Sequence, residues 1–367
     1  MINKIAVLTL LSAGLMVLAP GCGSSQEANA GTVSAEEVQT DAASKRKADL
    51  AGADVRGDTV ILSEHHPWLF FCGNDGQPLE TYQRTNLFSE EEIARIGENL
   101  HNLASDLDSV GTKFILFIPP MKEEVYSEWM PASIPVMDNE GRSMQLVNYM
   151  REHYPEIPVV YPLEQEIAAK EHYQNQILYY EGDCHWNDIG GHVGMEALLG
   201  EVGRQTGHPY ETKYKTFEET GEKIAGDLQS LVELGDEYLS TTYRPLQMSG
   251  YTVTEQTAKT EEEFAQMLAA GQNPDIPVRK FLMVREKSQN PEARMPVRTF
   301  ITGDSFMLSM MPYVCDAFPE TVAYSRYYLN MDAVLEMKPE VFIYEIAERY
   351  LSELNIIPGY NTAALKE

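Results

Sequence analysis

The most informative segment of the chain reads Arg298-Thr299-Phe300-Ile301-Thr302-Gly303-Asp304-Ser305-Phe306. Residues 298–302 are apolar enough to predict a short buried strand, and the apolar run from Phe306 to Phe318 favours a helix. A strand, a turn and a helix in this order place the Ser305 hydroxyl at the start of a helix. Backbone N–H groups at that position can bind an oxyanion. The segment therefore indicates an α/β fold in which Ser305 is a candidate nucleophile.

Gly303 in this segment and Pro312 after it lead to two further predictions. Gly303 would allow the turn an unusual backbone dihedral, because glycine has no Cβ atom. Pro312 lies inside the apolar run and is expected to interrupt the helix, since proline cannot donate a backbone hydrogen bond.

A second motif, Gly182-Asp183-Cys184-His185-Trp186, supplies the other groups that serine catalysis needs. A serine hydroxyl is a weak nucleophile and needs a base, and the pKa of histidine, about 6.5, makes its neutral form available for that task. The imidazole in turn needs an acceptor on its second nitrogen. In an extended segment, Asp183 and His185 would point to the same side. We therefore expect a triad of Asp183, His185 and Ser305.

Other interpretations of these motifs stay open. Gly-Asp-Ser is commonly only a turn, and Asp-x-His-Trp is also compatible with a loop whose side chains cap helices. A metal site would use Asp183, His185 and His192, with Cys184 as a further ligand. His192 lies seven residues beyond His185, however, and the chain contains no His-Glu-x-x-His motif. The sequence therefore favours neither a metal nor another cofactor.

Several further segments occur in a fixed order around these motifs. They are His66-Pro67-Trp68-Leu69-Phe70, Ile118-Pro119-Pro120-Met121-Lys122-Glu123-Glu124-Val125-Tyr126, Lys338-Pro339-Glu340-Val341 and Glu348-Arg349-Tyr350-Leu351. Over roughly residues 58–352, this series resembles the SGNH-like hydrolase and acetyltransferase domains of the alginate O-acetylation proteins and their DHHW-type relatives.

The resemblance implies a fold and a set of catalytic residues. The fold is an SGNH-like, flavodoxin-like three-layer sandwich with a mostly parallel sheet, and the catalytic residues match Asp183, His185 and Ser305. The aspartate and histidine precede the serine, which is a circular permutation of the usual SGNH order. This chain departs from the family at Cys184 and in the aspartate-rich flank around Asp188.

Six further residues are candidates for substrate binding or for support of the site. Lys122 and Tyr126 follow the apolar strand at 113–118, at an edge where open α/β sheets form a crevice, although such residues are often surface groups. Trp186 follows the histidine directly. Aromatic stacking makes Arg326 and Tyr328 candidates for binding sugar, with plain packing as the alternative.

The sixth candidate, Arg349, follows an apolar run at 341–344. Together with Glu345 and Glu348 it is expected to form a structural ion pair, with lining of the site as the alternative.

The N-terminus predicts export. Residues 1–21 read as a signal peptide, since the apolar run from Ile5 to Ala19 is too short to span a membrane. Leu18-Ala19-Pro20-Gly21-Cys22 resembles a lipobox, which predicts a lipid anchor on Cys22 at the outer face of the cell membrane. The alternative is a secreted or periplasmic protein without a lipid. Residues 22–57 are polar and predict a flexible tether.

Residues 58–367 are expected to form one catalytic domain, with an insertion at about 208–278 over the site. Ser89 and Glu92 form a capping box, and Asp188 is expected to cap a helix that extends through Val202. The remaining elements are predicted as strands at 113–118, 159–161, 281–284, 298–302 and 341–345 and a helix near 142–153.

Composition restricts the partners. The formal net charge of −28 argues against nucleic acid, which binds to basic patches. A neutral glycan would not be repelled by this negative charge. Apart from Cys22, the cysteines are Cys72, Cys184 and Cys315, which allow either one disulfide or three buried thiols.

These observations favour a serine-dependent O-acyltransferase that acetylates an extracellular polysaccharide or a cell-wall glycan through an acetyl-serine intermediate. The resemblance implies a membrane-bound acyltransferase as the source of the acetyl group. A carbohydrate acetylesterase would use the same triad with water as the acceptor, and a glycan-binding lipoprotein without turnover is a third hypothesis.

Overall fold

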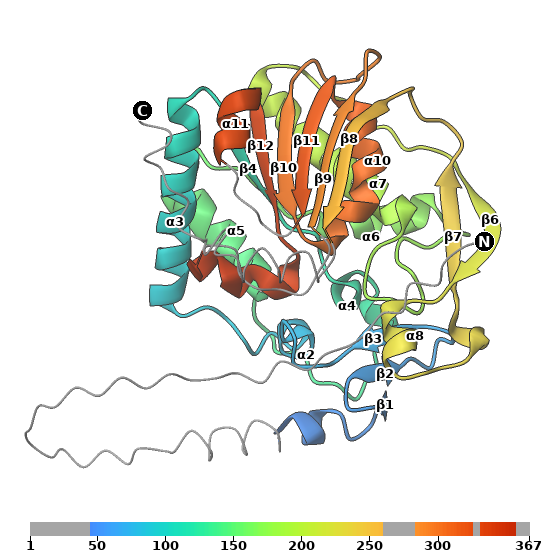
Figure 1. The fold of residues 1–367 in the computed structure, drawn as a ribbon. Coiled ribbons are helices and arrows are strands. Elements are labelled where there is room, and N and C mark those ends of the chain that lie inside the picture. Colours follow the sequence, from blue (N-terminus) through green and yellow to red (C-terminus); the bar gives the residue numbers. More distant parts are fainter. Residues whose placement is uncertain (1–44, 260–282, 326–330, 357–367) are drawn as a thin grey trace, which may run out of the picture.

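A computed structural model describes residues 45–259, 283–325 and 331–356 (Figure 1). Its centre is a seven-stranded sheet. From one edge to the other, the strands are β5 (Val159–Val160), β4 (Lys113–Phe117), β12 (Val341–Glu345), β10 (Thr299–Gly303), β11 (Glu320–Ser325), β9 (Met283–Gln289) and β8 (Thr252–Lys259). The strands from β5 to β11 are parallel, whereas β9 and β8 are antiparallel to their neighbours. The predicted α/β class with a mostly parallel sheet is confirmed.

Helices cover both faces of this sheet, which gives three layers (Figure 1). One face carries α6 (Leu163–His172), α7 (Asp188–Thr206) and α10 (Ser305–Ala317), and the other carries α3 (Glu90–Ser109), α5 (Arg142–His153) and α11 (Met331–Met337). Strand residues alternate between the two cores: Ile115 and Phe117 pack on the α7 side, and Phe114 and Leu116 on the α3 side. Across the described ranges, no helix is both long enough and apolar enough to cross a membrane.

Local sequence signals explain where several helices begin. The predicted capping box starts α3, since Ser89 Oγ accepts the Glu92 N–H and Glu92 accepts the Ser89 N–H at 2.9 Å. For α7, the expected cap is wrong by one residue. Asn187 is the N-cap and accepts the N–H groups of Ile189 and Gly190, whereas Asp188 is the first residue of the helix.

The helix after the serine continues through Pro312, contrary to the predicted interruption. Proline removes the hydrogen bond to the carbonyl group four residues earlier, which belongs to Leu308. Leu308 is 47% exposed, so this turn of the helix faces solvent. The helix therefore tolerates the proline.

Smaller elements surround one end of the sheet. They are a three-stranded sheet of β1 (Asp54–Arg56), β2 (Val60–Leu62) and β3 (Leu69–Phe71), helices α2 (Pro78–Tyr82) and α4 (Lys122–Val125), and 3-10 helices η1 (Ser127–Trp129) and η3 (Glu348–Ile356). The tether predicted at 22–57 is wrong at its C-terminal end, because β1 pairs with β2 and Arg46 forms an ion pair with Glu80 at 2.9 Å. The predicted signal peptide, Cys22 and residues 23–44 lie outside the described residues.

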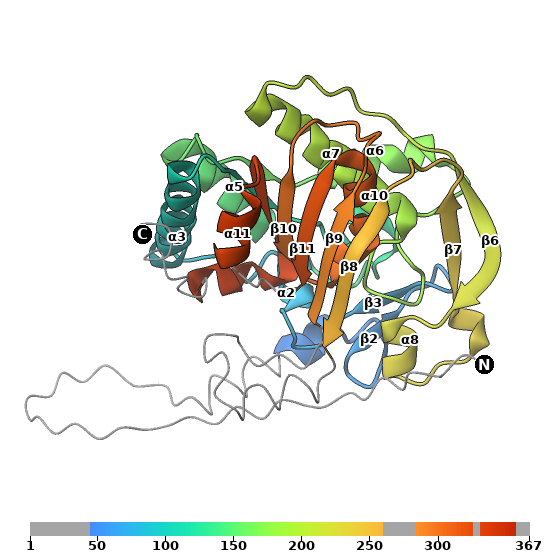
Figure 2. The same cartoon turned by 45° about the horizontal axis from the view of Figure 1, so that its top comes forward.

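The insertion predicted at about 208–278 is only partly separate from the domain. Outside the central sheet lie β6 (Phe217–Ile224), α8 (Asp227–Leu231), η2 (Asp236–Tyr238) and β7 (Ser240–Pro245), with β6 paired to β7 (Figure 2). Strand β8, by contrast, joins the central sheet as an edge strand. The segment does contact the candidate site, since Ser240 Oγ accepts the Gly182 N–H at 2.9 Å.

Candidate active site

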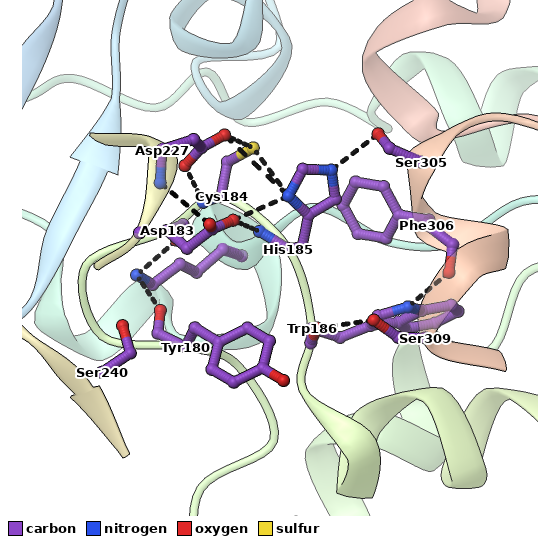
Figure 3. A network of polar contacts seen from close by, with 12 residues as sticks. Tyr180, Asp183, Cys184, His185, Trp186, Asp227, Ser240, Ser305, Phe306 and Ser309 are labelled. Carbon is purple, nitrogen blue, oxygen red and sulfur yellow. Dashed lines mark hydrogen bonds and ion pairs between the residues drawn. The ribbon is translucent and has the colours of Figure 1, made fainter. Parts of the chain in front are cut away.

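The aspartate and histidine of the Asp-x-His motif lie on a tight loop (Figure 3). The loop lies between Tyr179 and Trp186, which form an isolated antiparallel bridge. The extended conformation expected for this motif is wrong, because residues 183–185 form bends. Asp183 Oδ1 accepts the backbone N–H of His185 at 2.9 Å, which is an Asx-type turn. This turn, rather than strand alternation, brings the carboxylate beside the imidazole.

The three predicted catalytic side chains meet in one hydrogen-bonded chain (Figure 3). His185 Nδ1 lies 2.6 Å from Asp183 Oδ1, and His185 Nε2 lies 2.6 Å from Ser305 Oγ. Ser305 is the first residue of α10 and follows the end of β10, as the sequence predicted. The side chains of His185 and Asp183 are 21% and 18% exposed, so the site is open to a ligand.

The electrostatics of the pair stabilise its charged form. Burial alone would raise the pKa of Asp183, but the His185 imidazole and the N–H groups of Asp227 and His185 hold that pKa well below its ordinary value. Burial alone would lower the pKa of His185, but the adjacent Cys184 sulfur and the Asp183 carboxylate raise it well above 6.5. Since a general base must be neutral, His185 gains this capacity only as the pH rises.

Buried carboxyl groups support the start of α10. Asp304 is the N-cap, and its carboxylate accepts the N–H groups of Phe306 at 2.9 Å and Ala347 at 2.8 Å. The Asp304 N–H in turn donates to Glu345 Oε2 at 2.7 Å. Burial and the nearby Asp304 carboxylate raise the pKa of Glu345 well above its ordinary value, which favours its protonated form. Glu345 thus stabilises the turn that carries Ser305, a role that its sequence position did not reveal.

Gly303 is needed for space rather than for an unusual dihedral. It is absent from the glycines with positive φ, contrary to the expectation. A Cβ atom at this position would lie 1.9 Å from Glu345 Oε2. The close approach of Glu345 therefore explains the glycine.

Lys122 is completely buried beneath the histidine loop, so its interpretation as a surface group is wrong. Its ammonium group donates to four backbone carbonyl groups at 2.7–3.0 Å, those of Leu69, Tyr180, Glu181 and Asp183. Its Nζ also lies 4.5 Å from the centroid of the Trp68 ring. Burial lowers the pKa of Lys122 to about 8. Lys122 consequently holds the loop rather than contacting substrate.

Two aromatic candidates also act through packing. Trp186 is buried, and its Nε1 donates to the Phe306 carbonyl group at 2.9 Å, which ties the histidine loop to the first turn of α10. Tyr126 is buried as well. Its hydroxyl accepts the Leu178 N–H at 2.9 Å, and its ring stacks on Trp129 at a centroid distance of 4.6 Å.

The remaining candidates are Arg349, Arg326 and Tyr328. Among the described residues, Arg349 forms no ion pair with Glu345 or Glu348, so that expectation is wrong; its guanidinium group lies 4.8 Å from the centroid of the Tyr350 ring. Burial raises the pKa values of Cys184 and Asp227, and the positive charge of Arg349 partly counteracts this rise. Arg326 and Tyr328 lie outside the described residues.

Asp227, at the start of α8, is a site residue that the sequence interpretation missed. Its carboxylate accepts the Cys184 N–H at 2.9 Å and the Cys184 thiol at 2.8 Å, and its own N–H donates to Asp183 Oδ2 at 2.9 Å. Gly226 makes this contact possible, because a Cβ atom there would lie 2.1 Å from the Gly182 oxygen. The one local signal, a Gly-Asp pair, is too common in turns to identify the residue.

The structure also tests the expectations for the cysteines and for a metal site. Cys72, Cys184 and Cys315 are buried and form no disulfide with one another. The metal set that included His192 is not assembled: His192 is buried in α7, where its Nε2 bonds to Lys213 O at 3.0 Å. Asp183, Cys184, His185 and Asp227 do have ligand atoms within 4.8 Å of one another.

Comparison with known families gives one match. A family model described as SGNH hydrolase-like domain, acetyltransferase AlgX, matches residues 65–278, which is more than half of the chain. This range includes Asp183 and His185. The SGNH-like fold implied by the sequence motifs is therefore confirmed. A comparison with curated proteins finds no match.

Solved structures with a similar fold include PatB1 from Bacillus cereus. It is 17% identical with a TM-score of 0.51, over 72% of this chain and 91% of that one. PatB1 with a sulfonyl adduct is 16% identical with a TM-score of 0.53, over 82% and 97%. The O-acetyltransferase domain of Pseudomonas putida AlgJ is 17% identical with a TM-score of 0.48, over 84% and 99%.

The buried ammonium group of Lys122 gives a first prediction. Lys122→Ala should lower the free energy of unfolding by about 3 kcal/mol, because several buried carbonyl groups lose their donor. Chemical denaturation measures this change. Lys113→Ala is the control: the ammonium group of Lys113 forms an exposed ion pair with Asp108, and its removal should change stability by less than about 1 kcal/mol. Equal losses in the two variants would contradict the role of Lys122.

Proposed function

Because this chain belongs to the family of SGNH hydrolase-like acetyltransferase domains described for AlgX, we propose that it O-acetylates an extracellular polysaccharide or a cell-wall glycan through an acetyl-serine intermediate. One observation carries the proposed mechanism. His185 lies 2.6 Å from Ser305 Oγ through one ring nitrogen and 2.6 Å from Asp183 through the other. A hydroxyl, a base and an orienting carboxylate in this order form the arrangement of a serine acyl-transfer enzyme.

In the first half-reaction, Ser305 Oγ attacks the acetyl carbonyl carbon of the donor while His185 Nε2 takes the serine proton. Asp183 accepts a hydrogen bond from Nδ1, which keeps the lone pair of Nε2 directed at the serine and stabilises the imidazolium that forms. The bond between the acetyl group and the donor then breaks, and His185 returns the proton to the leaving oxygen. Acetyl-Ser305 remains.

In the second half-reaction, a sugar hydroxyl attacks acetyl-Ser305. His185 removes the proton of that hydroxyl and returns one to Ser305 Oγ as the ester bond to serine breaks. The Phe306 N–H is engaged by the Asp304 cap. The N–H of Ser305, the first residue of α10, has no acceptor within the helix and is the oxyanion donor that we propose.

We extend the proposal to the setting of the reaction. The signal-like run and Cys22 support a protein anchored by lipid at the outer face of a membrane, where a membrane-bound acyltransferase would supply acetyl groups. The formal net charge of −28 favours a neutral glycan over a polyanion as the acceptor.

Cys22 provides a direct test of the anchor. In a bacterial host with lipoprotein processing, the mature chain should begin at Cys22, incorporate labelled fatty acid and fractionate with membranes. Cys22→Ser should abolish labelling and release the chain, because the acyl chains provide the membrane affinity. An unlabelled Cys22 in the mature wild-type chain would contradict the anchor.

Ser305 is tested with purified protein, an activated acetyl ester and an oligosaccharide. Mass spectrometry should find acetyl on the peptide that contains Ser305, and acetylated sugar. Ser305→Ala should reduce transfer by about a thousandfold or more, because the nucleophile is lost. Ser309→Ala, one turn further along α10, is the matched control and should retain activity. Release of acetate without sugar acetylation would identify an esterase, and full transfer by Ser305→Ala would refute the nucleophile.

The pH dependence tests the pairing of His185 with Asp183. Only neutral imidazole can take the serine proton, so kcat/KM should rise with pH through the raised pKa of His185. Asp183→Asn removes the carboxylate that raises this pKa, so the rising limb should move to lower pH. Its plateau should fall by about three to four orders of magnitude, since the imidazole loses its orienting partner. If the rising limb of kcat/KM lay at the same pH in the wild type and in Asp183→Asn, the pairing of His185 with Asp183 would be contradicted.

A further inference from the structure

Four side chains around the histidine loop converge in a way that acyl transfer does not require. Asp227, brought in by α8, completes a group with Asp183, Cys184 and His185 (Figure 3). His185 Nδ1 lies 2.6 Å from Asp183 Oδ1, 3.5 Å from Cys184 Sγ and 3.9 Å from Asp227 Oδ2. Cys184 Sγ lies 2.8 Å from Asp227 Oδ2.

Two of these four separations are close to those of a tetrahedral zinc site. With Zn–S near ~2.3 Å and Zn–N and Zn–O near ~2.1 Å, neighbouring ligand atoms are roughly 3.4–3.6 Å apart. The distances from Nδ1 to Cys184 Sγ and Asp227 Oδ2 are 3.5 and 3.9 Å, close to this range. The two shorter distances are hydrogen bonds whose protons a metal ion would replace, and each must lengthen by about 1 Å.

We propose that Asp183, Cys184, His185 and Asp227 bind a thiophilic divalent cation, with Zn²⁺ as the best fit, and that the bound ion switches off acyl transfer. The inhibitory effect rests on the function proposed above, whereas binding of the ion does not. Thiolate and imidazole ligands select zinc over magnesium and calcium, which prefer oxygen ligands alone.

The inhibition follows from proton positions. Binding releases the thiol proton of Cys184 to solvent, because the thiolate is the ligand. The metal also needs the lone pair of His185 Nδ1, so the imidazole proton moves from Nδ1 to Nε2. Nε2 then donates to Ser305 Oγ and can no longer accept the serine proton. The serine loses its base, although His185 Nε2 and Ser305 Oγ remain hydrogen-bonded.

The surroundings hold the ligands in position. The backbone N–H groups of His185 and Asp227 donate to the two oxygens of Asp183, and the Cys184 N–H donates to Asp227 Oδ1, all at 2.9 Å. Such supporting hydrogen bonds orient metal ligands. A divalent ion with two carboxylates and one thiolate leaves a single negative charge, which the charge of Arg349 offsets, since it acts on both Cys184 and Asp227.

Binding is tested first, without any activity assay. The full chain is equilibrated with Zn²⁺ by dialysis and its metal content is measured; one zinc ion per chain is expected. Cys184→Ser and Asp227→Asn should each weaken binding at least about tenfold, because each loses a ligand. Ser305→Ala and Cys72→Ala are controls and should bind as the wild type does. Co²⁺ should add a sulfur-to-metal charge-transfer band that Cys184→Ser lacks. No bound zinc in the wild type, or wild-type zinc affinity in Cys184→Ser and Asp227→Asn, would overturn the site.

Inhibition is then measured as acetyl transfer in Zn²⁺ relative to transfer in chelator, separately for each protein. Wild type should be inhibited and then restored by chelator, whereas Cys184→Ser and Asp227→Asn should need at least about tenfold more zinc. Zinc that binds without slowing transfer would refute the switch. If no protein transfers acetyl in chelator, the proposed function fails, and dialysis still decides the metal site.

Discussion

The position of the histidine loop depends on the buried ammonium group of Lys122. Four carbonyl oxygens converge on it, three of them from residues 180–183. Without a cation between them, these oxygens would repel one another, and the loop could not turn inward. The fourth oxygen belongs to Leu69 in β3, and the Leu69 N–H donates to Glu181 O at 3.0 Å. The small sheet outside the central layers is thus part of the support for the site.

The nucleophile is held by a different part of the molecule. Ser305 is placed by a central parallel strand and the helix that follows it, where buried packing on both faces leaves little freedom. The histidine is placed by the loop between Tyr179 and Trp186, which lies outside this sheet. The hydrogen bond from Trp186 to the Phe306 carbonyl group joins the two parts directly beneath the reacting atoms. A loop that is irregular in itself therefore keeps a defined distance to a rigid serine.

The sequence predicted best what is local. The Ser89–Glu92 cap, the strand that leads to Ser305 and the pairing of Asp183 with His185 all depend on neighbours a few positions apart. Prediction from the sequence failed where contacts between residues far apart in the chain determine the structure. Asp227 lies 43 residues from Cys184, and nothing near Lys122 reveals that carbonyl groups from two other segments will surround it. The antiparallel direction of β9 is likewise set by pairing with β8 and β11, not by its own residues.

Two predictions from local patterns were also wrong, because a side chain can form more than one short hydrogen bond with the nearby backbone. The Asp-x-His spacing suited an extended segment, but the aspartate formed a turn with its own backbone. Of two adjacent candidates for capping α7, Asn187 rather than Asp188 took the position.

The close approach of Gly303 and Glu345 links two distant positions of the chain. A side chain at 303 would displace the carboxyl group that accepts the Asp304 N–H, and a shorter residue at 345 would leave that N–H without its acceptor. The carboxyl group of Glu345 therefore has its place only while position 303 lacks a Cβ atom. Gly303 and Glu345 should therefore vary together, although 42 positions of the chain separate them (345 − 303).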